Sequence, residues 1–287
     1  MLSVAWRCLA LVCLQVLAQE AFAGFGAIQA DAASVLSHRP YDIVTIHPHN
    51  VSSFTEGLLF DGGHLLESTG LNGQSFIREI DAVTGVGTGN EFKFPDGIFG
   101  EGIAVLNGTI YALSYQAKVG YALDRSTFAL QREFAFATTT GEGWGMTTDG
   151  AHLIVSDGSA TLLFLDPNSM DEVRRVVVTQ HGVQVRLLNE LEYIHGEIFA
   201  NVWYTNQILR IDPATGHVLQ ALLLDQLPLL ENHARTIPED WRKMDAVMNG
   251  IAHNPLNNHV YVTGKLWDAV FELDLALPKV VHGRRVH

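Results

Sequence analysis

The feature that most constrains the fold is a motif that recurs five times along the chain. Each copy has an apolar start, a turn rich in Gly, Asn or Asp, and an alternating apolar run. The copies are "FTEGLLFDGGHLLESTG", "FGEGIAVLNGTIYALSY", "GWGMTTDGAHLIVSDG", "NELEYIHGEIFANVW" and "NGIAHNPLNNHVYVTGK". Each continues into a third strand that ends in Asp, such as "FIREID" or "VFELD", and the earlier copies then add a fourth strand such as "EFKF".

The spacing of the repeats indicates the architecture. The steps are 45, 43, 46 and 59 residues, measured between the aligned positions Gly57, Gly102, Gly145, Leu191 and Gly250. Units of roughly 40–50 residues with four strands each are typical of a β-propeller. The sequence therefore predicts an all-β protein, a five-bladed β-propeller over residues 41–276, with a C-terminal tail at 277–287. A two-sheet sandwich also uses short strands, but five repeats in register favour the propeller.

Two segments fall outside the repeat. The fifth copy nearly ends after its third strand, while "YDIVTIH" at 41–47 is a spare alternating strand before the first copy. We expect this strand to close the ring as the outer strand of the last blade, which removes open sheet edges. The long last step comes from a polar insertion at 227–248, between blades 4 and 5. We expect this insertion to be partly helical and to act as a lid over the site.

The first 23 residues have the pattern of a secretory signal peptide. Arg7 precedes an apolar run, and Ala21-Phe22-Ala23 ends it with an A-x-A sequence. A membrane anchor would need about 18 uninterrupted apolar residues, and Gln15 and Gln19 break the run first. A lipoprotein fits less well, because Val12 replaces the small residue expected before Cys13. We therefore expect a secreted or periplasmic protein without a membrane association after cleavage, in which residues 24–40 precede the propeller.

Cysteine content and charge exclude several classes of function. Both cysteines, Cys8 and Cys13, lie in the signal, so the mature chain has no disulfide, thiol nucleophile or thiolate metal site. The net charge is −13, and no basic patch is visible before the tail "HGRRVH", which excludes nucleic acid as a partner. The sequence "HPH" at 47–49 has no spaced third ligand for a metal.

Residues at equivalent places in the repeats should gather at one mouth of the central channel. The start of the first strand and the end of the second lie at the same end of an antiparallel hairpin. One ring therefore contains Glu56, Glu101, Trp144, Glu190 and Asn249, with Asn189 one place earlier. The other contains Gly70, Tyr115, Gly158, Trp203 and Lys265. Taken alone, a tryptophan is usually core and a lysine usually solvated, but a concave cluster of carboxylates, aromatics and one lysine predicts a functional site.

Two further residues have structural explanations. Glu67 replaces the small apolar residue of the other repeats, and burial of a carboxylate without a partner is costly. Glu67 either supports the site residues from beneath the cavity or forms a structural hydrogen bond or ion pair with a backbone amide or with Arg78. We favour the structural interaction. Trp267 lies outside both rings, and we expect it to serve in packing.

The repeats resemble the plant-type and bacterial glutaminyl cyclases from about residue 40 to 275. The resemblance rests on "FTEGLLF", "LLESTGLNGQS", "FGEG", "GWGMTTDG", "LNELEY", "NGIAHNP" and "VYVTGKLW". It implies a five-bladed propeller that is unrelated to the zinc-dependent animal enzymes. The implied activity is that of a glutaminyl-peptide cyclotransferase, which closes the N-terminal glutamine of peptides or proteins to pyroglutamate and releases ammonia. Chemistry would require no metal, although a structural metal ion in the central channel is compatible with the family.

The resemblance also implies roles for the ring residues. It assigns proton transfer to Glu101, and Asn189 and Lys265 are the candidate donors to the oxyanion. We expect these three to be catalytic and four others to bind substrate: Glu56, Tyr115, Trp144 and Trp203. We expect dry surroundings to raise the pKa of the catalytic carboxyl. Glu56 and Tyr115 depart from the family's Gln and Trp, so activity could be weaker, shifted in pH or directed at another substrate.

Two other classes of function stay open at this stage. A metal-dependent propeller hydrolase such as a lactonase would need converging ligands, which Glu56, Glu101, Asn189 and Asn249 could supply. An exported binding or scaffold propeller would hold a peptide end without turnover. We expect the protein to be a monomer.

Overall fold

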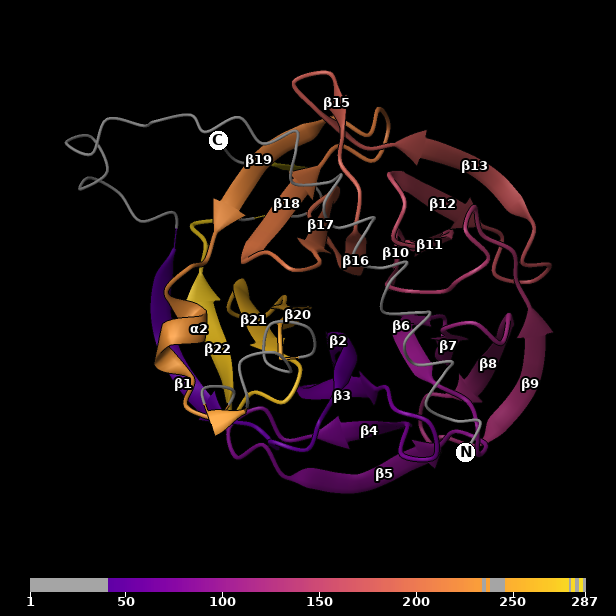
Figure 1. Cartoon of the computed structure of the whole chain (residues 1–287), viewed down its shortest axis with the longest axis horizontal. Helices are drawn as coiled ribbons and strands as arrows, with labels where there is room; N and C mark the ends of the chain where they lie inside the picture. The colour runs from indigo at the N-terminus through magenta and orange to yellow at the C-terminus, as the bar shows by residue number, and fades with distance from the viewer. Residues whose placement is uncertain (1–40, 234–235, 238–245, 279, 282–283, 286–287) are drawn as a thin grey trace, which may run out of the picture. The chain divides into compact units, whose positions relative to one another are not determined.

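Five four-stranded antiparallel sheets follow one another around a ring, as Figure 1 shows. The computed structural model describes residues 41–233, 236–237, 246–278, 280–281 and 284–285. Among these residues, helix is confined to one short α-helix and isolated turns. The prediction of an all-β, five-bladed propeller is confirmed.

Each repeat of the sequence is one sheet. Blade 1 consists of β2 (Thr55–Asp61), β3 (His64–Thr69), β4 (Phe76–Ile80) and β5 (Gly87–Lys93). Blade 2 consists of β6 (Gly100–Leu106), β7 (Thr109–Ser114), β8 (Val119–Asp124) and β9 (Leu130–Ala135). Blade 3 consists of β10 (Met146–Thr148), β11 (Leu153–Val155), β12 (Thr161–Leu165) and β13 (Glu172–Val177). Blade 4 consists of β16 (Leu188–Ile194), β17 (Glu197–Val202), β18 (Gln207–Ile211) and β19 (Val218–Leu223).

The fifth blade is built from both ends of the propeller sequence. It contains β20 (Met248–Asn254), β21 (His259–Gly264), β22 (Ala269–Asp274) and, at its outer edge, β1 (Asp42–Pro48). β1 runs antiparallel to β22, with Asp42 opposite Asp274 and Pro48 opposite Ala269. The spare strand at 41–47 thus forms most of β1.

Burial changes from the inside of a blade to its outside, and the sequence changes with it. Strands such as β17 and β11 are buried along their whole length, because neighbouring blades cover both of their faces. They are correspondingly rich in apolar residues. The outer strands β9 and β5 are mostly exposed and polar. On β9 only Phe134 is buried, and its side chain packs in the apolar core.

The innermost strands approach one another closely around the ring. β2 contacts β6 and β20, and β10 and β16 complete the circle of contacts. A Cβ atom on Gly57, Gly102 or Gly145 would lie within 2.9 Å of a backbone atom of the next inner strand. The repeated glycine is therefore required because the blades meet backbone to backbone at these places.

Short segments lie between or beyond the blades. The hairpin of β14 (Thr179–Gln180) and β15 (Val183–Gln184) connects blades 3 and 4, and β23 (Val280–Val281) pairs with β24 (Arg284–Arg285) in the tail. The insertion begins with α2 (Leu227–Leu230), but residues 234–235 and 238–245 lie outside the described residues. The lid therefore stays a prediction.

The predicted signal peptide, at 1–23, also lies outside the described residues, as does the segment 24–40. In the described part of the chain, no helix has the length and apolar character needed to cross a membrane.

Candidate active site

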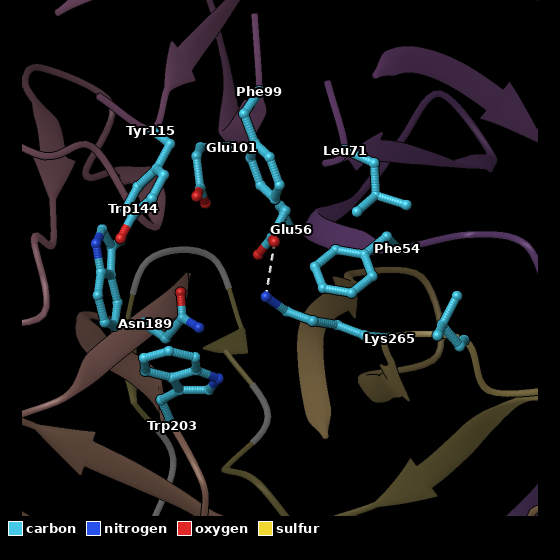
Figure 2. Close-up of a pocket in the computed structure, with 11 residues that line it drawn as sticks. Phe54, Glu56, Leu71, Phe99, Glu101, Tyr115, Trp144, Asn189, Trp203 and Lys265 are labelled. Carbon is cyan, nitrogen blue, oxygen red and sulfur yellow. Dashed lines mark hydrogen bonds and ion pairs between the residues drawn. The ribbon is translucent and has the colours of Figure 1, made fainter. Parts of the chain in front are cut away.

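A cavity of about 310 Å³ opens at the mouth where the two rings were expected. Figure 2 shows the side chains that surround it. They are Phe54, Glu56, Leu71, Phe99, Glu101, Tyr115, Trp144, Asn189, Trp203, Lys265 and Leu266. All seven residues predicted for the site line this one cavity, although they come from all five blades. Phe54, Leu71, Phe99 and Leu266 were not predicted.

β-Bulges aim the polar residues of the inner strands. The register of the first hairpin shifts between Thr55 and Gly57, so Glu56 is the extra residue. Equivalent shifts surround Glu101 in blade 2 and Asn189 in blade 4. A bulge bends its strand and redirects a side chain, and bulges are common beside active sites. Asn189 follows the paired residue Leu188 as Glu101 follows Gly100, so the two positions are equivalent, and the repeat alignment in blade 4 was one residue late.

Two members of the expected first ring do not line the cavity. The carboxylate of Glu190 accepts backbone N–H groups from Leu58, at 3.3 Å, and Ile251, at 2.8 Å. The amide of Asn249 donates to the carbonyl oxygen of Thr55 at 3.0 Å. Both residues thus connect inner strands of different blades. Glu190 occupies the place of Gly102 in its bulge, because the repeat alignment in blade 4 was one residue late. Asn249 holds the position equivalent to Glu101, but its amide is bonded to the inner strand of blade 1.

Lys265 forms a buried ion pair with Glu56. Its Nζ lies 2.6 Å from Oε1 of Glu56, and the residues are 5% and 2% exposed. The ammonium also lies 4.6 Å from the centre of the Phe54 ring. Lys265 lines the same cavity as Glu101 and Asn189, but its bonded partner is Glu56. The departure from the family's Gln thus supplies a counter-charge for the lysine.

Glu101 is a buried carboxyl group with a perturbed ionisation. Burial and the negative charges of Glu56 and Glu142 raise its pKa well above the usual value, while the charge of Lys265 lowers it. The direction agrees with the prediction for a dry site. Near neutral pH, such a group can exchange a proton with a bound amine more readily than an exposed carboxylate.

Three aromatic side chains form one wall of the cavity. The rings of Trp144 and Trp203 meet edge to face, with centres 5.1 Å apart. Gly158 leaves room for this arrangement, because a Cβ atom there would lie 2.6 Å from the Trp144 ring. Tyr115 lines the cavity as well, and Figure 2 shows it beside Trp144.

Glu142, which the sequence did not single out, connects this wall to its surroundings. Its carboxylate accepts hydrogen bonds from Trp144 Nε1, at 3.1 Å, and Gln116 Nε2, at 2.8 Å. Burial, followed by the charge and hydrogen bond of Glu142, raises the pKa of Tyr115. The only signal in the sequence is its place two residues before Trp144 in a glycine-rich loop.

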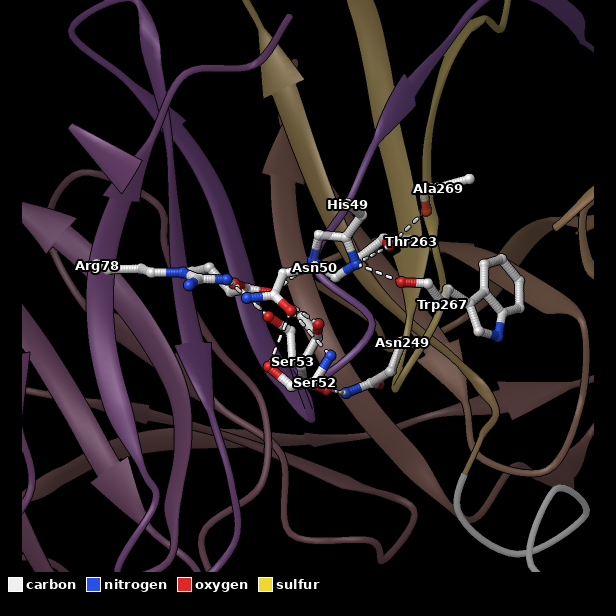
Figure 3. A network of polar contacts seen from close by, with 11 residues as sticks. His49, Asn50, Ser52, Ser53, Arg78, Asn249, Thr263, Trp267 and Ala269 are labelled. Atoms are coloured by element: carbon white, nitrogen blue, oxygen red, sulfur yellow. Dashed lines mark hydrogen bonds and ion pairs between the residues drawn. The ribbon is translucent and has the colours of Figure 1, made fainter. Parts of the chain in front are cut away.

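A buried polar network lies around Glu67, and Figure 3 labels its members His49, Ser53 and Arg78. This fully buried carboxylate accepts bonds from Thr55 at 2.8 Å, Ser53 at 3.1 Å and Arg78 at 2.9 Å, and pairs with His49 at 2.7 Å. Burial by itself would raise its pKa, but the charges of His49 and Arg78 and the hydrogen bonds of His49 and Thr55 lower it to about 2.

The network is consistent with both explanations offered for Glu67. The expected tie to Arg78 is present. In addition, Ser53 and Thr55 flank Phe54, and Thr55 directly precedes Glu56. Their hydrogen bonds to Glu67 therefore hold the start of β2 at the cavity.

Trp267 serves in packing, as predicted. It is 1% exposed, and its indole covers Gly264, where a Cβ atom would lie 2.4 Å from the ring. Its Nε1 donates to the carbonyl oxygen of Ala246 at 3.3 Å.

The histidines of "HPH" have carboxylate partners. His47 Nε2 lies 2.9 Å from Glu272, and His49 belongs to the network of Glu67. Within the described ranges, no group of three or more His, Cys, Asp or Glu side chains is arranged to hold a metal ion. The structural ion in the channel stays a prediction without a visible ligand set.

Comparisons with known proteins agree with the family resemblance. The family model described as glutamine cyclotransferase matches residues 10–275. A glutaminyl-peptide cyclotransferase of Arabidopsis thaliana is 37% identical over 245 residues, which are 84% of this chain and 73% of the relative. The crystal structure of Myxococcus xanthus glutaminyl cyclase superposes with a TM-score of 0.74 at 32% identity, covering 82% of this chain and 95% of that one.

Proposed function

This chain belongs to the glutamine cyclotransferase family, and from that premise we propose how its cavity acts as a glutaminyl-peptide cyclotransferase. The substrate is a peptide or protein with an N-terminal glutamine. The observation that carries the proposal is the buried carboxyl of Glu101, which shares one cavity with the Asn189 amide and two tryptophans. The comparisons support this activity over a binding module or a metal-dependent hydrolase.

The reaction needs one proton to move between two nitrogen atoms. The substrate's α-nitrogen attacks its own side-chain amide carbon, a C–N bond closes the five-membered ring, and the bond to the departing nitrogen breaks. Ionised Glu101 accepts the proton from the α-nitrogen and gives it to the departing nitrogen, which leaves as ammonia. The carboxylate ends the cycle ionised, so no other reactant is consumed.

The tetrahedral intermediate carries a negative oxygen that needs donors. We assign these to the Asn189 amide and to Lys265, whose ammonium has three N–H groups and directs one toward Glu56. Glu56 and Tyr115 contact the bound glutamine, and Trp144 and Trp203 exclude water from it. Because ring closure is intramolecular, the protein acts mainly by orientation and by replacing water around the amine.

The remaining properties belong to the same proposal. No metal is required for the chemistry, so activity should survive EDTA. The protein is exported as a monomer into the periplasm or the medium, and the mature chain should begin at Gly24, which mass spectrometry of the natural product would show.

The activity can be tested directly with purified protein and a synthetic Gln-Xaa peptide. The peptide should lose the mass of one ammonia molecule, and Glu101→Gln should reduce kcat by about 100-fold or more, because an amide cannot accept the proton. Glu133→Gln is the matched control, since this carboxylate is exposed on β9 of the same blade. An unchanged peptide mass with both the natural protein and Glu56→Gln would sink the proposal.

A further inference from the structure

Two leucines that line the cavity have an unusual backbone conformation. Leu71 has φ = 80° and Leu266 has φ = 61°, both in the left-handed region that bulky L-residues rarely adopt. Such residues concentrate at functional sites, where the surrounding structure holds them in place. Both leucines are partly exposed, whereas Glu101 and Lys265 are each 5% exposed. The leucines therefore lie at the entrance and the charged groups at the floor.

The two leucines occupy the same place in the repeat. Leu71 directly follows Gly70, and Leu266 directly follows Lys265, at the end of the second strand of blades 1 and 5. The left-handed turn at this place directs the chain away from the blade and leaves the leucine side chain at the cavity.

Hydrogen bonds fix the backbone at both positions. The carbonyl oxygen of Leu71 accepts the Gln74 N–H at 3.0 Å and the Ser75 hydroxyl at 2.9 Å. The N–H of Leu266 donates to Ser53 at 2.7 Å, and its carbonyl oxygen is 3.0 Å from the ring nitrogen Nδ1 of His233. The backbone at both leucines is therefore held in place before any ligand arrives.

The cavity has two chemically different sides. Figure 2 shows Trp144 and Trp203 on one side, near Glu101 and Asn189, and Leu71 with Phe54 on the other. The second side is hydrocarbon apart from the ammonium of Lys265, whose charge is compensated by Glu56. It offers no uncompensated charge to a charged ligand.

We propose that Leu71, Leu266 and Phe54 form the subsite for the residue that follows the N-terminal glutamine, and that this subsite selects an apolar side chain. The inference rests on the proposed function. With the glutamine beside Glu101 and Asn189, the next residue of the peptide has the leucine side of the cavity to occupy. Burial of an apolar side chain against two leucines and a phenylalanine releases water from all partners, whereas a charged side chain would lose its hydration there.

The test compares Gln-Phe-amide with Gln-Gly-amide and measures ammonia release. The natural protein should show a kcat/KM for Gln-Phe-amide about ten-fold or more above that for Gln-Gly-amide. Leu71→Asn and Leu266→Asn should each bring this ratio several-fold closer to one, because asparagine tolerates the left-handed conformation but is polar. Leu266→Gly, which removes the side chain without backbone strain, should lower the ratio in the same way.

Leu256→Asn is the control for the substitution itself, because Leu256 is 86% exposed and does not line the cavity. It should leave the ratio unchanged. Turnover of both amides with equal efficiency by the natural protein would overturn the subsite alone. A ratio that stays unchanged in every folded leucine variant would also overturn the subsite alone. A lack of ammonia from both amides would overturn the proposed function, and the subsite with it.

Discussion

The ionisation of Glu101 depends on three neighbouring charges. Burial, Glu56 and Glu142 raise its pKa, and Lys265 lowers it. Because Glu101 must be ionised to accept the proton of the substrate amine, kcat/KM should rise with pH through the raised pKa of this carboxyl. Removal of any one of these neighbouring charges should therefore shift the acidic limb of the kcat/KM pH profile.

Glu142 gives the clearest test of this dependence, because it is not a lining residue of the cavity. Glu142→Gln removes one negative charge that raises the pKa of Glu101, so the acidic limb of kcat/KM should move to lower pH. The measurement is a pH profile of ammonia release. Glu133→Gln should leave the profile in place. A limb that does not move, or moves to higher pH, would show that Glu142 acts only through its hydrogen bonds to Trp144 and Gln116.

At the scale of the strand, the start of β2 combines a β-bulge with the network of Glu67. The bulge aims Glu56 into the cavity, while Ser53 and Thr55 on either side of Phe54 bond to the Glu67 carboxylate on β3. The network thus fixes a strand end that an isolated hairpin would leave free to fray. The network buries the Glu67 carboxylate, and the ion pairs with His49 and Arg78 offset the free-energy cost of that burial.

Glu67→Gln should destabilise the fold by about 3–5 kcal/mol, because it leaves the charges of His49 and Arg78 without their buried partner. The free energy of unfolding in urea at neutral pH measures this loss. Glu91→Gln, on the exposed strand β5 of the same blade, is the control and should have little effect.

The sign of the pH dependence gives a second check on Glu67. Its pKa is about 2 in the folded chain and 4.5 in the reference state, so its contribution is present above pH 4.5. The contribution is lost as the pH falls toward 2. Glu67→Gln should therefore weaken the loss of stability with acid. Equal stability of variant and natural protein at neutral pH would contradict a stabilising role.

At the scale of the whole molecule, side chains of β16 connect inner strands of separate blades. Glu190 accepts N–H groups from β2 and β20, and Glu192 accepts the N–H of His253 on β20 at 3.0 Å. Burial raises the pKa of Glu192 to about 8. The ring is thus joined in part by buried carboxyl groups, of which Glu192 is protonated at neutral pH.

Glu192 should make the fold less stable as the pH rises. Between pH 4.5 and about 8 the folded chain keeps the proton that the unfolded chain releases. The free energy of unfolding should therefore fall by at most about 1.4 kcal/mol per pH unit from this one group. Glu192→Gln, which cannot ionise, should remove this part of the slope. Urea unfolding at several pH values measures it, and an identical slope in the variant would refute the assignment.

The sequence by itself determined the architecture and most of the residues of the site. Five copies of one motif specify five similar sheets, because each copy contains its own alternation, turns and inner glycine. Equivalent places in the copies then gather at one mouth, and together with the family resemblance they predicted seven side chains from five blades that line the cavity.

The tertiary structure decided which atoms meet. Lys265 pairs with Glu56, 209 positions away, and not with Glu101. A bulge brings Asn189 to the cavity, and left-handed turns place Leu71 and Leu266 at its entrance. Repeat spacing gives only the place of a residue along a strand, whereas its partner, its pKa and its direction depend on neighbours that distant segments bring near. For this reason the chemistry of the site could be located from the sequence, but its electrostatics and its entrance could not.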